Sequence, residues 1–97
     1  MPVDISIIIP TYNRASLLRR AVASALAACP DKAEVVVVDD QSDTAEGALA
    51  DVADDPRLTV VTNAGDKGAS GARNFGVQIA RGAIVIFLDD DDEIIAD

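Results

Sequence analysis

The sequence lacks several residue types that common functional sites require. It contains no histidine among its 97 residues, which excludes a Ser-His-Asp or Cys-His nucleophilic site and any histidine-ligated zinc within this chain. It has no tryptophan and only 3% aromatic residues, so a stacking surface for single-stranded nucleic acid is not expected. Basic residues are also few, 8 against 17 acidic ones, and the net charge of −9 argues against binding to a nucleic-acid backbone.

Cysteine and long apolar runs are scarce as well. The single cysteine, Cys29, cannot form an internal disulfide, which suits a reducing compartment and leads us to expect a cytoplasmic protein. We interpret Cys29 as a small apolar residue near a helix end rather than as a reactive thiol. No apolar run reaches the length of a membrane span or of a signal-peptide core, so no membrane segment is expected in these residues.

The remaining composition, 49% apolar and 26% charged, is typical of one globular domain. Short β-branched runs alternate with Ala-rich stretches in which apolar residues recur at helical spacing. Strands are predicted at residues 5–9, 35–38, 58–62 and 83–88. Helices are predicted at residues 14–28, 44–52 and 69–80. Pro10 is expected to end the first strand because proline has no backbone N–H to donate.

This order, β-α-β-α-β-α-β, predicts an α/β fold with an open, Rossmann-like parallel sheet and right-handed crossovers. The fourth strand is apolar on both faces, and the sequence ends a few residues after it. An apolar strand requires cover on both sides. We therefore expect these residues to be the first part of a longer protein.

Acidic side chains follow two of the predicted strands, at residues 39–40 and 89–92. Ligands of open parallel sheets bind beyond the carboxyl ends of the strands, where these two clusters would meet and repel each other unless a cation or a donor lies between them. Oxygen ligands suit Mg²⁺ or Mn²⁺, and alternate residues of an extended segment would direct Asp89 and Asp91 to one site. A solvated loop stays open as the alternative reading. An EF-hand is disfavoured because its glycine is absent.

Residues 68–76, Gly-Ala-Ser-Gly-Ala-Arg-Asn-Phe-Gly, predict a glycine-rich helix start that carries Arg73 one turn in. The glycines match neither G-x-G-x-x-G nor a Walker loop, so a dinucleotide site of the usual kind is disfavoured. Two interpretations remain. The small residues allow the helix to pack closely on the sheet, or the segment also directs Arg73 toward the edge where the acidic clusters lie.

Four segments together resemble glycosyltransferase family 2: residues 7–14 (IIIPTYNR), 36–42 (VVVDDQS), 68–76 (GASGARNFG) and 86–92 (IFLDDDD). The resemblance covers essentially the whole chain; Gln41 departs from it, since glycine or asparagine is more usual there. It implies a GT-A fold with strand order 3-2-1-4. It also implies an enzyme that transfers a sugar, with inversion, from a nucleotide diphosphate donor, most often a UDP-sugar. Residues 1–97 would be the nucleotide-sugar-binding half, truncated after the D-x-D motif.

The resemblance implies which residues bind the nucleotide. Pro10, Thr11 and Tyr12 would form the base pocket, with Tyr12 stacking on or flanking the uracil. Asp40 would accept a hydrogen bond from the ring N–H of the base, a contact that a neutral acceptor makes less strongly. Arg73 would lie near the base and the diphosphate.

The acidic run is similar to the D-x-D motif of the family. By this resemblance Asp90 would lie near the ribose and Asp91 on the metal, Mn²⁺ or Mg²⁺, with Asp89 assisting. The catalytic base and the acceptor site of the family lie beyond this motif, so the base is expected downstream of Asp97 and the 97 residues alone are expected to be inactive. The acceptor would be a saccharide, a lipid-linked group or another hydroxyl, and the full-length protein could be membrane-associated.

Two functions of other classes stay open beside this one. A nucleotidyltransferase has a related sheet and a similar acidic metal site, but usually carries a glycine-rich basic loop after the first strand, unlike residues 12–15. A phosphoacceptor signalling domain is also acidic at this edge of its sheet. It requires an acid pair after the first strand, where this sequence has Pro10, Thr11 and Tyr12.

Overall fold

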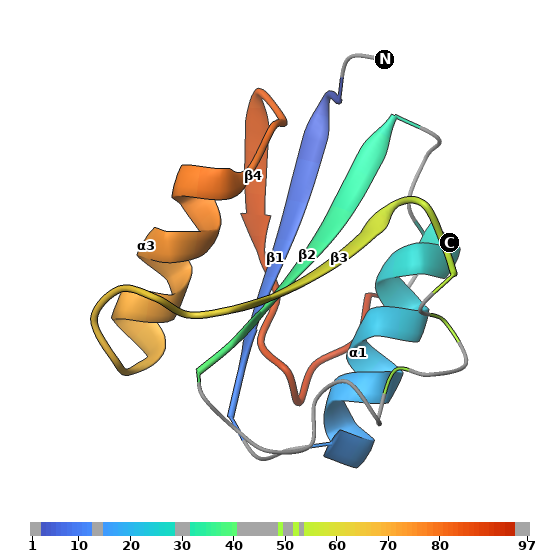
Figure 1. Cartoon of the computed structure of the whole chain (residues 1–97). Coiled ribbons are helices and arrows are strands. Elements are labelled where there is room, and N and C mark those ends of the chain that lie inside the picture. Colours follow the sequence, from blue (N-terminus) through green and yellow to red (C-terminus); the bar gives the residue numbers. More distant parts are fainter. Residues whose placement is uncertain are drawn as a thin grey trace.

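Four strands, all parallel to their neighbours, form one sheet with a helix on each face in the computed structural model (Figure 1). The structure describes residues 3–12, 15–28, 32–40, 49, 52 and 54–94. The elements are β1 (Ile5–Thr11), α1 (Ala15–Ala28), β2 (Ala33–Asp39), β3 (Leu58–Thr62), α3 (Ala69–Ile79) and β4 (Ile84–Phe87). Of the helix predicted at 44–52, only Leu49 and Val52 are among the described residues.

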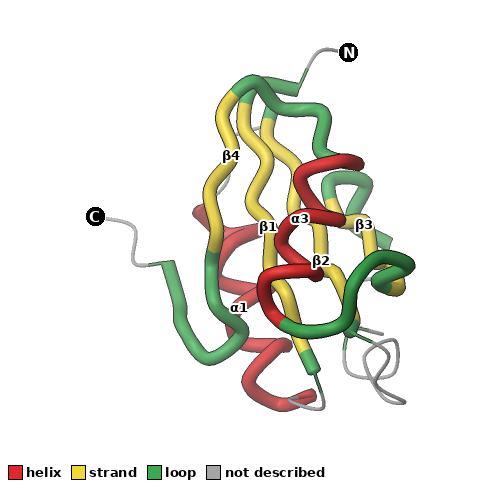
Figure 2. The backbone as a smooth tube through the Cα atoms, turned by 90° about the vertical axis from the view of Figure 1, so that its left-hand side faces the viewer, coloured by secondary structure: helices red, strands yellow, loops and turns green. Residues whose placement is uncertain are grey.

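The strands follow one another across the sheet in the order β3-β2-β1-β4, which confirms the predicted order (Figure 2). β1 and β2 are therefore central, and β4 lies at an edge. Three large apolar side chains of β4 are exposed, those of Ile84, Ile86 and Phe87. The strand order 3-2-1-4 that the resemblance implied thus places this apolar strand at an edge of the sheet.

Alternation along the central strands divides the core into two layers. Ile7 and Ile9 of β1 pack with Leu18 and other buried residues of α1. Ile8, the residue between them, packs on the opposite face with Ala72 of α3. The valines of β2 divide in the same way, which explains why the middle of each strand is apolar at consecutive positions rather than at alternate ones.

The expectation that Pro10 ends the first strand was wrong, because β1 continues through it to Thr11. Thr11 accepts a hydrogen bond from the Asp40 N–H at 2.8 Å and so faces β2. Adjacent residues of a strand face opposite neighbours, so Pro10 faces β4. Pairing of β1 with β4 ends at Ile8 and Phe87, and the missing N–H therefore costs no bond of that ladder.

Close packing of α3 on the sheet depends on Gly76. A Cβ atom at this position would lie 2.6 Å from Cγ2 of Ile8 and 3.1 Å from Cγ2 of Val38. Both neighbours are buried β-branched residues of the central strands and have little rotamer freedom. The small residues of this segment therefore do allow close approach, and they bring Arg73 near the carboxyl ends of the strands.

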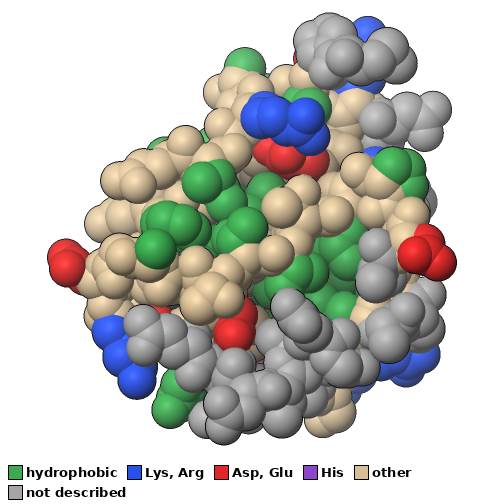
Figure 3. All heavy atoms as spheres, in the orientation of Figure 1, with side chains coloured by type: hydrophobic (Ala, Val, Ile, Leu, Met, Phe, Trp, Pro, Cys, Tyr) green, Lys and Arg blue, Asp and Glu red, His purple; other side chains and the backbone are tan. Residues whose placement is uncertain are grey.

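A buried carboxylate fixes the connection from α3 to β4 at the opposite end of the sheet, where the strands begin. Glu34 Oε2 accepts hydrogen bonds from Ser6 Oγ at 2.6 Å and from the Arg81 N–H at 2.7 Å, and the Gly82 N–H donates to Ser6 Oγ at 2.8 Å. Figure 3 shows basic and acidic side chains in contact at this end of the molecule. Burial raises the pKa of Glu34, but the hydrogen bonds from Arg81 and Ser6 outweigh it, and the pKa lies below its ordinary value.

Candidate functional site

A cavity of about 400 Å³ opens beside the carboxyl ends of β1 and β2, the N-terminal half of α3 and the turn after β4. Open α/β sheets bind their ligands at this edge, and the volume suits a small organic ligand. All eight residues that the sequence predicted to bind nucleotide or metal line it. With two alanines of α3, the lining is Pro10, Thr11, Tyr12, Asp40, Ala69, Ala72, Arg73, Asp89, Asp90 and Asp91.

Asp40 is buried and lines the cavity, and both of its oxygens accept hydrogen bonds from the segment after β3. Oδ1 accepts from Asn63 Nδ2 at 3.0 Å, and Oδ2 accepts from the Gly68 N–H at 2.9 Å. Gly68 has a φ of +108°, which side chains disfavour, so glycine suits this contact. The repulsion expected between the two acidic clusters is therefore reduced at Asp40 by donors from the chain itself.

Asn63 supports the site, and its role was not predicted from the sequence. Its side chain is 1% exposed, and its Nδ2 also donates to the Asp66 carbonyl at 2.8 Å. Its Oδ1 accepts from the Gly65 N–H at 2.9 Å, so this one amide fixes both the loop and Asp40. Its position directly after β3, at the carboxyl edge of the sheet, was the one available signal.

Tyr12 presents an aromatic face at the mouth of the cavity. The residue is 48% exposed, and the Lys67 ammonium lies 5.3 Å from the centroid of its ring. That distance falls within the range of a cation–π contact. Lys67 is a second residue that the sequence reasoning did not single out, and it adds a positive charge beside the aromatic ring.

Residues 89–92 form a turn, which we call the acidic turn, rather than the extended segment that the sequence suggested. The Asp92 N–H donates to the Asp89 carbonyl at 3.0 Å, which closes the turn shortly after β4 ends. Asp89 and Asp91 nevertheless come together, and Asp92 joins them. One carboxylate oxygen from each of the three lies within 4.8 Å of the others, and all three residues are exposed.

The remaining acid of this turn points inward. Asp90 is 7% exposed, and its Oδ2 accepts a hydrogen bond from Thr11 Oγ1 at 2.9 Å. Arg73 contacts the turn from α3, with its Nη2 atom 3.1 Å from Asp89 Oδ1. The cavity is thus lined by the Tyr12 ring, the Asp40 carboxylate and Arg73, and Arg73 meets the carboxylates of the acidic turn.

Three hard oxygen donors in a cluster suit a divalent cation such as Mg²⁺ or Mn²⁺. An arginine beside them can bind phosphate oxygens through its planar guanidinium. The site as a whole therefore fits a ligand with a flat polar ring at one end and phosphate groups at the other. Comparison with known families decides its class, because the model of "Glycosyl transferase family 2" matches residues 6–97.

The chain belongs to glycosyl transferase family 2. Among curated members of the family, it is 41% identical over 91 residues to the succinoglycan biosynthesis protein ExoO of Rhizobium meliloti (strain 1021), covering 94% of this chain and 26% of ExoO. It is 36% identical over 88 residues to WfaP of Escherichia coli, named as a UDP-Glc:alpha-D-GlcNAc-diphosphoundecaprenol beta-1,3-glucosyltransferase, covering 91% of this chain and 35% of WfaP. The chain therefore spans about a quarter to a third of these relatives.

Solved structures of glycosyltransferases share the fold. The mannosyltransferase PcManGT from Pyrobaculum calidifontis, in complex with GDP-Man and Mn²⁺, superposes with a TM-score of 0.79 at 33% identity, over 94% of this chain and 28% of that one. S. aureus TarS 1-349 in complex with UDP gives a TM-score of 0.78 at 32% identity, over 92% of this chain and 28% of that one. The GT-A fold and the predicted family membership are confirmed. Among the described residues, neither helix combines the length and hydrophobicity that a membrane span needs.

Proposed function

We propose that these residues bind the nucleoside diphosphate sugar donor, together with Mn²⁺ or Mg²⁺, in an inverting glycosyltransferase. The observation that carries the proposal is that one cavity is lined by Tyr12, Asp40, Arg73 and the acidic turn. A base, a diphosphate and a metal ion need these kinds of surface: an aromatic face with a hydrogen-bond acceptor, a cationic group and a cluster of carboxylates. The family membership and the nucleotides in the structures of two similar proteins support the same conclusion.

At one end of the cavity, the base would lie against Pro10, Thr11 and Tyr12. The exposed ring of Tyr12 offers a stacking surface for a pyrimidine, and Lys67 beside that ring would attract the negatively charged ligand. Asp40 already accepts two hydrogen bonds, but a carboxylate has about four lone-pair sites. It therefore retains the capacity to accept one more bond from a ring N–H. Uracil offers this donor at N3, although guanine offers one at N1 as well, and UDP is the nucleotide that we propose.

At the other end, the carboxylates of Asp89, Asp91 and Asp92 would hold the cation. A bound divalent cation would neutralise the diphosphate charge, which these carboxylates alone would repel. Arg73 pairs with Asp89 and lines the cavity, so it is placed to contact the phosphate oxygens as well. Asp90, which faces inward, would accept a hydrogen bond from the ribose.

The acceptor and the exact donor belong to the same proposal. A UDP-sugar is the proposed donor. WfaP, whose name gives UDP-Glc and a diphosphoundecaprenol-linked sugar, supports this donor and a lipid-linked or other saccharide hydroxyl as the acceptor. The expected cytoplasmic location, with association of a longer protein at the membrane, stays a prediction. No observation favours a nucleotidyltransferase or a phosphoacceptor domain.

Calorimetric titration of the chain with UDP, uridine and GDP, each with Mn²⁺ present, tests the proposal. UDP should bind, and uridine should bind far more weakly because it lacks the diphosphate. GDP should be weaker than UDP because the proposed pocket beside Tyr12 would accommodate the smaller pyrimidine; the Asp40 contact alone does not discriminate, since guanine also has a ring N–H. Equal affinity for uridine and UDP would contradict the metal-diphosphate part of the site. Equal affinity for GDP and UDP would contradict the base assignment alone.

A further inference from the structure

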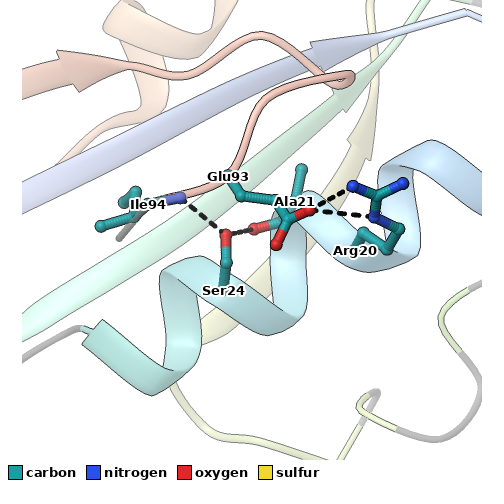
Figure 4. Close-up of polar contacts among 5 residues, drawn as sticks. All are labelled: Arg20, Ala21, Ser24, Glu93 and Ile94. Carbon is teal, nitrogen blue, oxygen red and sulfur yellow. Dashed lines mark hydrogen bonds and ion pairs between the residues drawn. The ribbon is translucent and has the colours of Figure 1, made fainter. Parts of the chain in front are cut away.

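The segment that follows the acidic turn contacts α1 (Figure 4). No described residue of α1 lines the cavity. The Ile94 N–H donates to Ser24 Oγ at 3.0 Å. Arg20 Nε donates to Glu93 Oε1 at 3.0 Å, and Arg20 Nη2 contacts the same oxygen. Two consecutive residues of this segment are therefore bound to two residues that lie one turn apart on α1.

Ser24 is well suited to hold a backbone group. Its hydroxyl donates to the Ala21 carbonyl at 2.8 Å within the helix, which orients the oxygen so that it can accept from Ile94 (Figure 4). The contact is partly buried, so the Ile94 N–H depends on this acceptor more than an exposed group would. The Ile94 side chain also packs against the core layer between the sheet and α1. Hydrogen bonding and apolar packing thus fix Ile94 at one place.

The acidic turn is held on both of its sides. Thr11 and Arg73 hold Asp90 and Asp89 where the turn begins, and α1 holds the residues that come directly after Asp92. Asp91 and Asp92 lie between these two sets of contacts. A cation that needs several carboxylate oxygens in one place is sensitive to the position of this short segment.

We propose that Ser24 and Arg20 are positioning residues for the metal-binding carboxylates of the acidic turn. The inference rests on the proposed function, because it concerns the cation that would bind with the donor. Ser24 acts without charge, by fixing the backbone at Ile94. Arg20 fixes Glu93, the residue after Asp92, through an ion pair at the surface.

The first test compares Ser24→Ala, Ser24→Thr and Ser16→Ala in the chain with UDP present, using electron paramagnetic resonance to count free Mn²⁺. Alanine keeps the helix and changes no charge, so its effect on Mn²⁺ cannot be electrostatic. Ser24→Ala should weaken Mn²⁺ binding about fivefold, the equivalent of one lost hydrogen bond of about 1 kcal/mol. Ser24→Thr keeps the hydroxyl and should restore the affinity. Ser16→Ala removes an exposed serine of the same helix and should change nothing.

The second test uses Arg20→Gln, for which positioning and simple electrostatics predict opposite results. Removing a cation from the neighbourhood of a metal site should strengthen Mn²⁺ binding if charge alone matters. If Arg20 positions the turn, binding should instead weaken, about twofold to threefold for an exposed ion pair. Arg20→Lys should recover part of the Mn²⁺ affinity. Lys32→Gln, an equal change of charge directly before β2, serves as the control.

The outcomes separate the inference from the function it rests on. If the unmodified chain binds Mn²⁺ with UDP and Ser24→Ala binds it equally tightly, the positioning inference is wrong and the proposed function stands. If Arg20→Gln binds Mn²⁺ more tightly, the role of Arg20 is wrong. If the unmodified chain binds no Mn²⁺ with UDP, the proposed metal site is wrong, and the inference about Ser24 and Arg20 is overturned with it.

Discussion

Thr11 Oγ1 donates a hydrogen bond of 2.9 Å to Asp90 Oδ2, although the two residues are separated by 79 positions in the sequence. Both residues are buried, with exposed fractions of 4% and 7%. The bond joins the end of the first strand to the acidic turn after the last one. It keeps one carboxylate of the run directed inward while its neighbours Asp89 and Asp91 form the exposed cluster.

Replacing Thr11 with valine should therefore destabilise the chain. Valine keeps the shape and the β-branch but removes a donor from a buried carboxylate, at a cost of about 1–3 kcal/mol. Urea unfolding of the two proteins measures the difference. Thr59→Val, at an exposed position of β3, is the matched control and should leave stability within about 0.5 kcal/mol. Equal stability of Thr11→Val and the unmodified chain would show that the bond contributes nothing.

Replacing Asp40 with alanine should weaken UDP binding by roughly 1.5–3 kcal/mol, the range for a hydrogen bond to a charged group. Metal binding at the acidic turn should remain nearly intact, since Asp40 does not belong to that cluster. Exchange of the Gly68 amide hydrogen should also accelerate, because Asp40 Oδ2 is its acceptor. Calorimetry and hydrogen exchange measure the two effects separately. A larger loss of UDP affinity in Asp39→Ala would mean that the wrong member of the pair was assigned to the base.

Because the pKa of Glu34 is lowered in the folded chain, the free energy of unfolding should fall as the pH falls. A carboxylate whose pKa is lower in the folded state than in the unfolded state stabilises the fold above its unfolded pKa, ordinarily 4.5. That stability is lost as the pH falls through the folded pKa. Urea unfolding from pH 6 down to pH 3 should therefore show a steeper decline for the unmodified chain than for Glu34→Gln, which cannot titrate. Parallel declines would contradict the contribution of Glu34.

The chain should bind the donor without transferring its sugar to an acceptor. Activation of an acceptor hydroxyl usually needs a positioned base within about 3 Å. Within the described part of the chain, each carboxylate at the cavity already has a partner or a proposed ligand, and the sequence has no histidine to serve instead. Labelled UDP-sugars incubated with Mn²⁺ and saccharide acceptors, with a longer family member in parallel, provide the assay. An acceptor glycosylated by the 97 residues would contradict this expectation.

The strands and their parallel arrangement followed from patterns that the sequence displays directly, whereas the strand order that places β4 at an edge followed from the resemblance to the family. Runs of isoleucine and valine predict buried parallel strands, and the alternation with helices leaves few topologies. The resemblance to the family then supplied all eight residues that line the cavity with the two alanines of α3. Pro10 was misjudged because its effect depends on which neighbour it faces and on where that pairing ends, which only the register of the strands reveals.

The contacts that shape the site were harder to predict. Asn63 fixes Asp40 across 23 positions, and Ser24 binds a backbone group 70 positions away. Such bonds join one polar side chain to one partner and leave no periodic pattern in the sequence. The turn at residues 89–92 was read as extended because alternation in an extended segment would direct Asp89 and Asp91 to one site, although aspartate also favours turns.

The metal dependence of UDP binding tests the central claim most directly. Calorimetric titrations with UDP in Mn²⁺ and in EDTA should show binding only in Mn²⁺, and Asp91→Asn should remove most of the metal-dependent affinity. Asp92→Asn, in the same cluster, measures whether the third carboxylate also contributes. UDP that binds equally well in EDTA and in Mn²⁺ would contradict the account, because the acidic turn would then have no part in holding the donor.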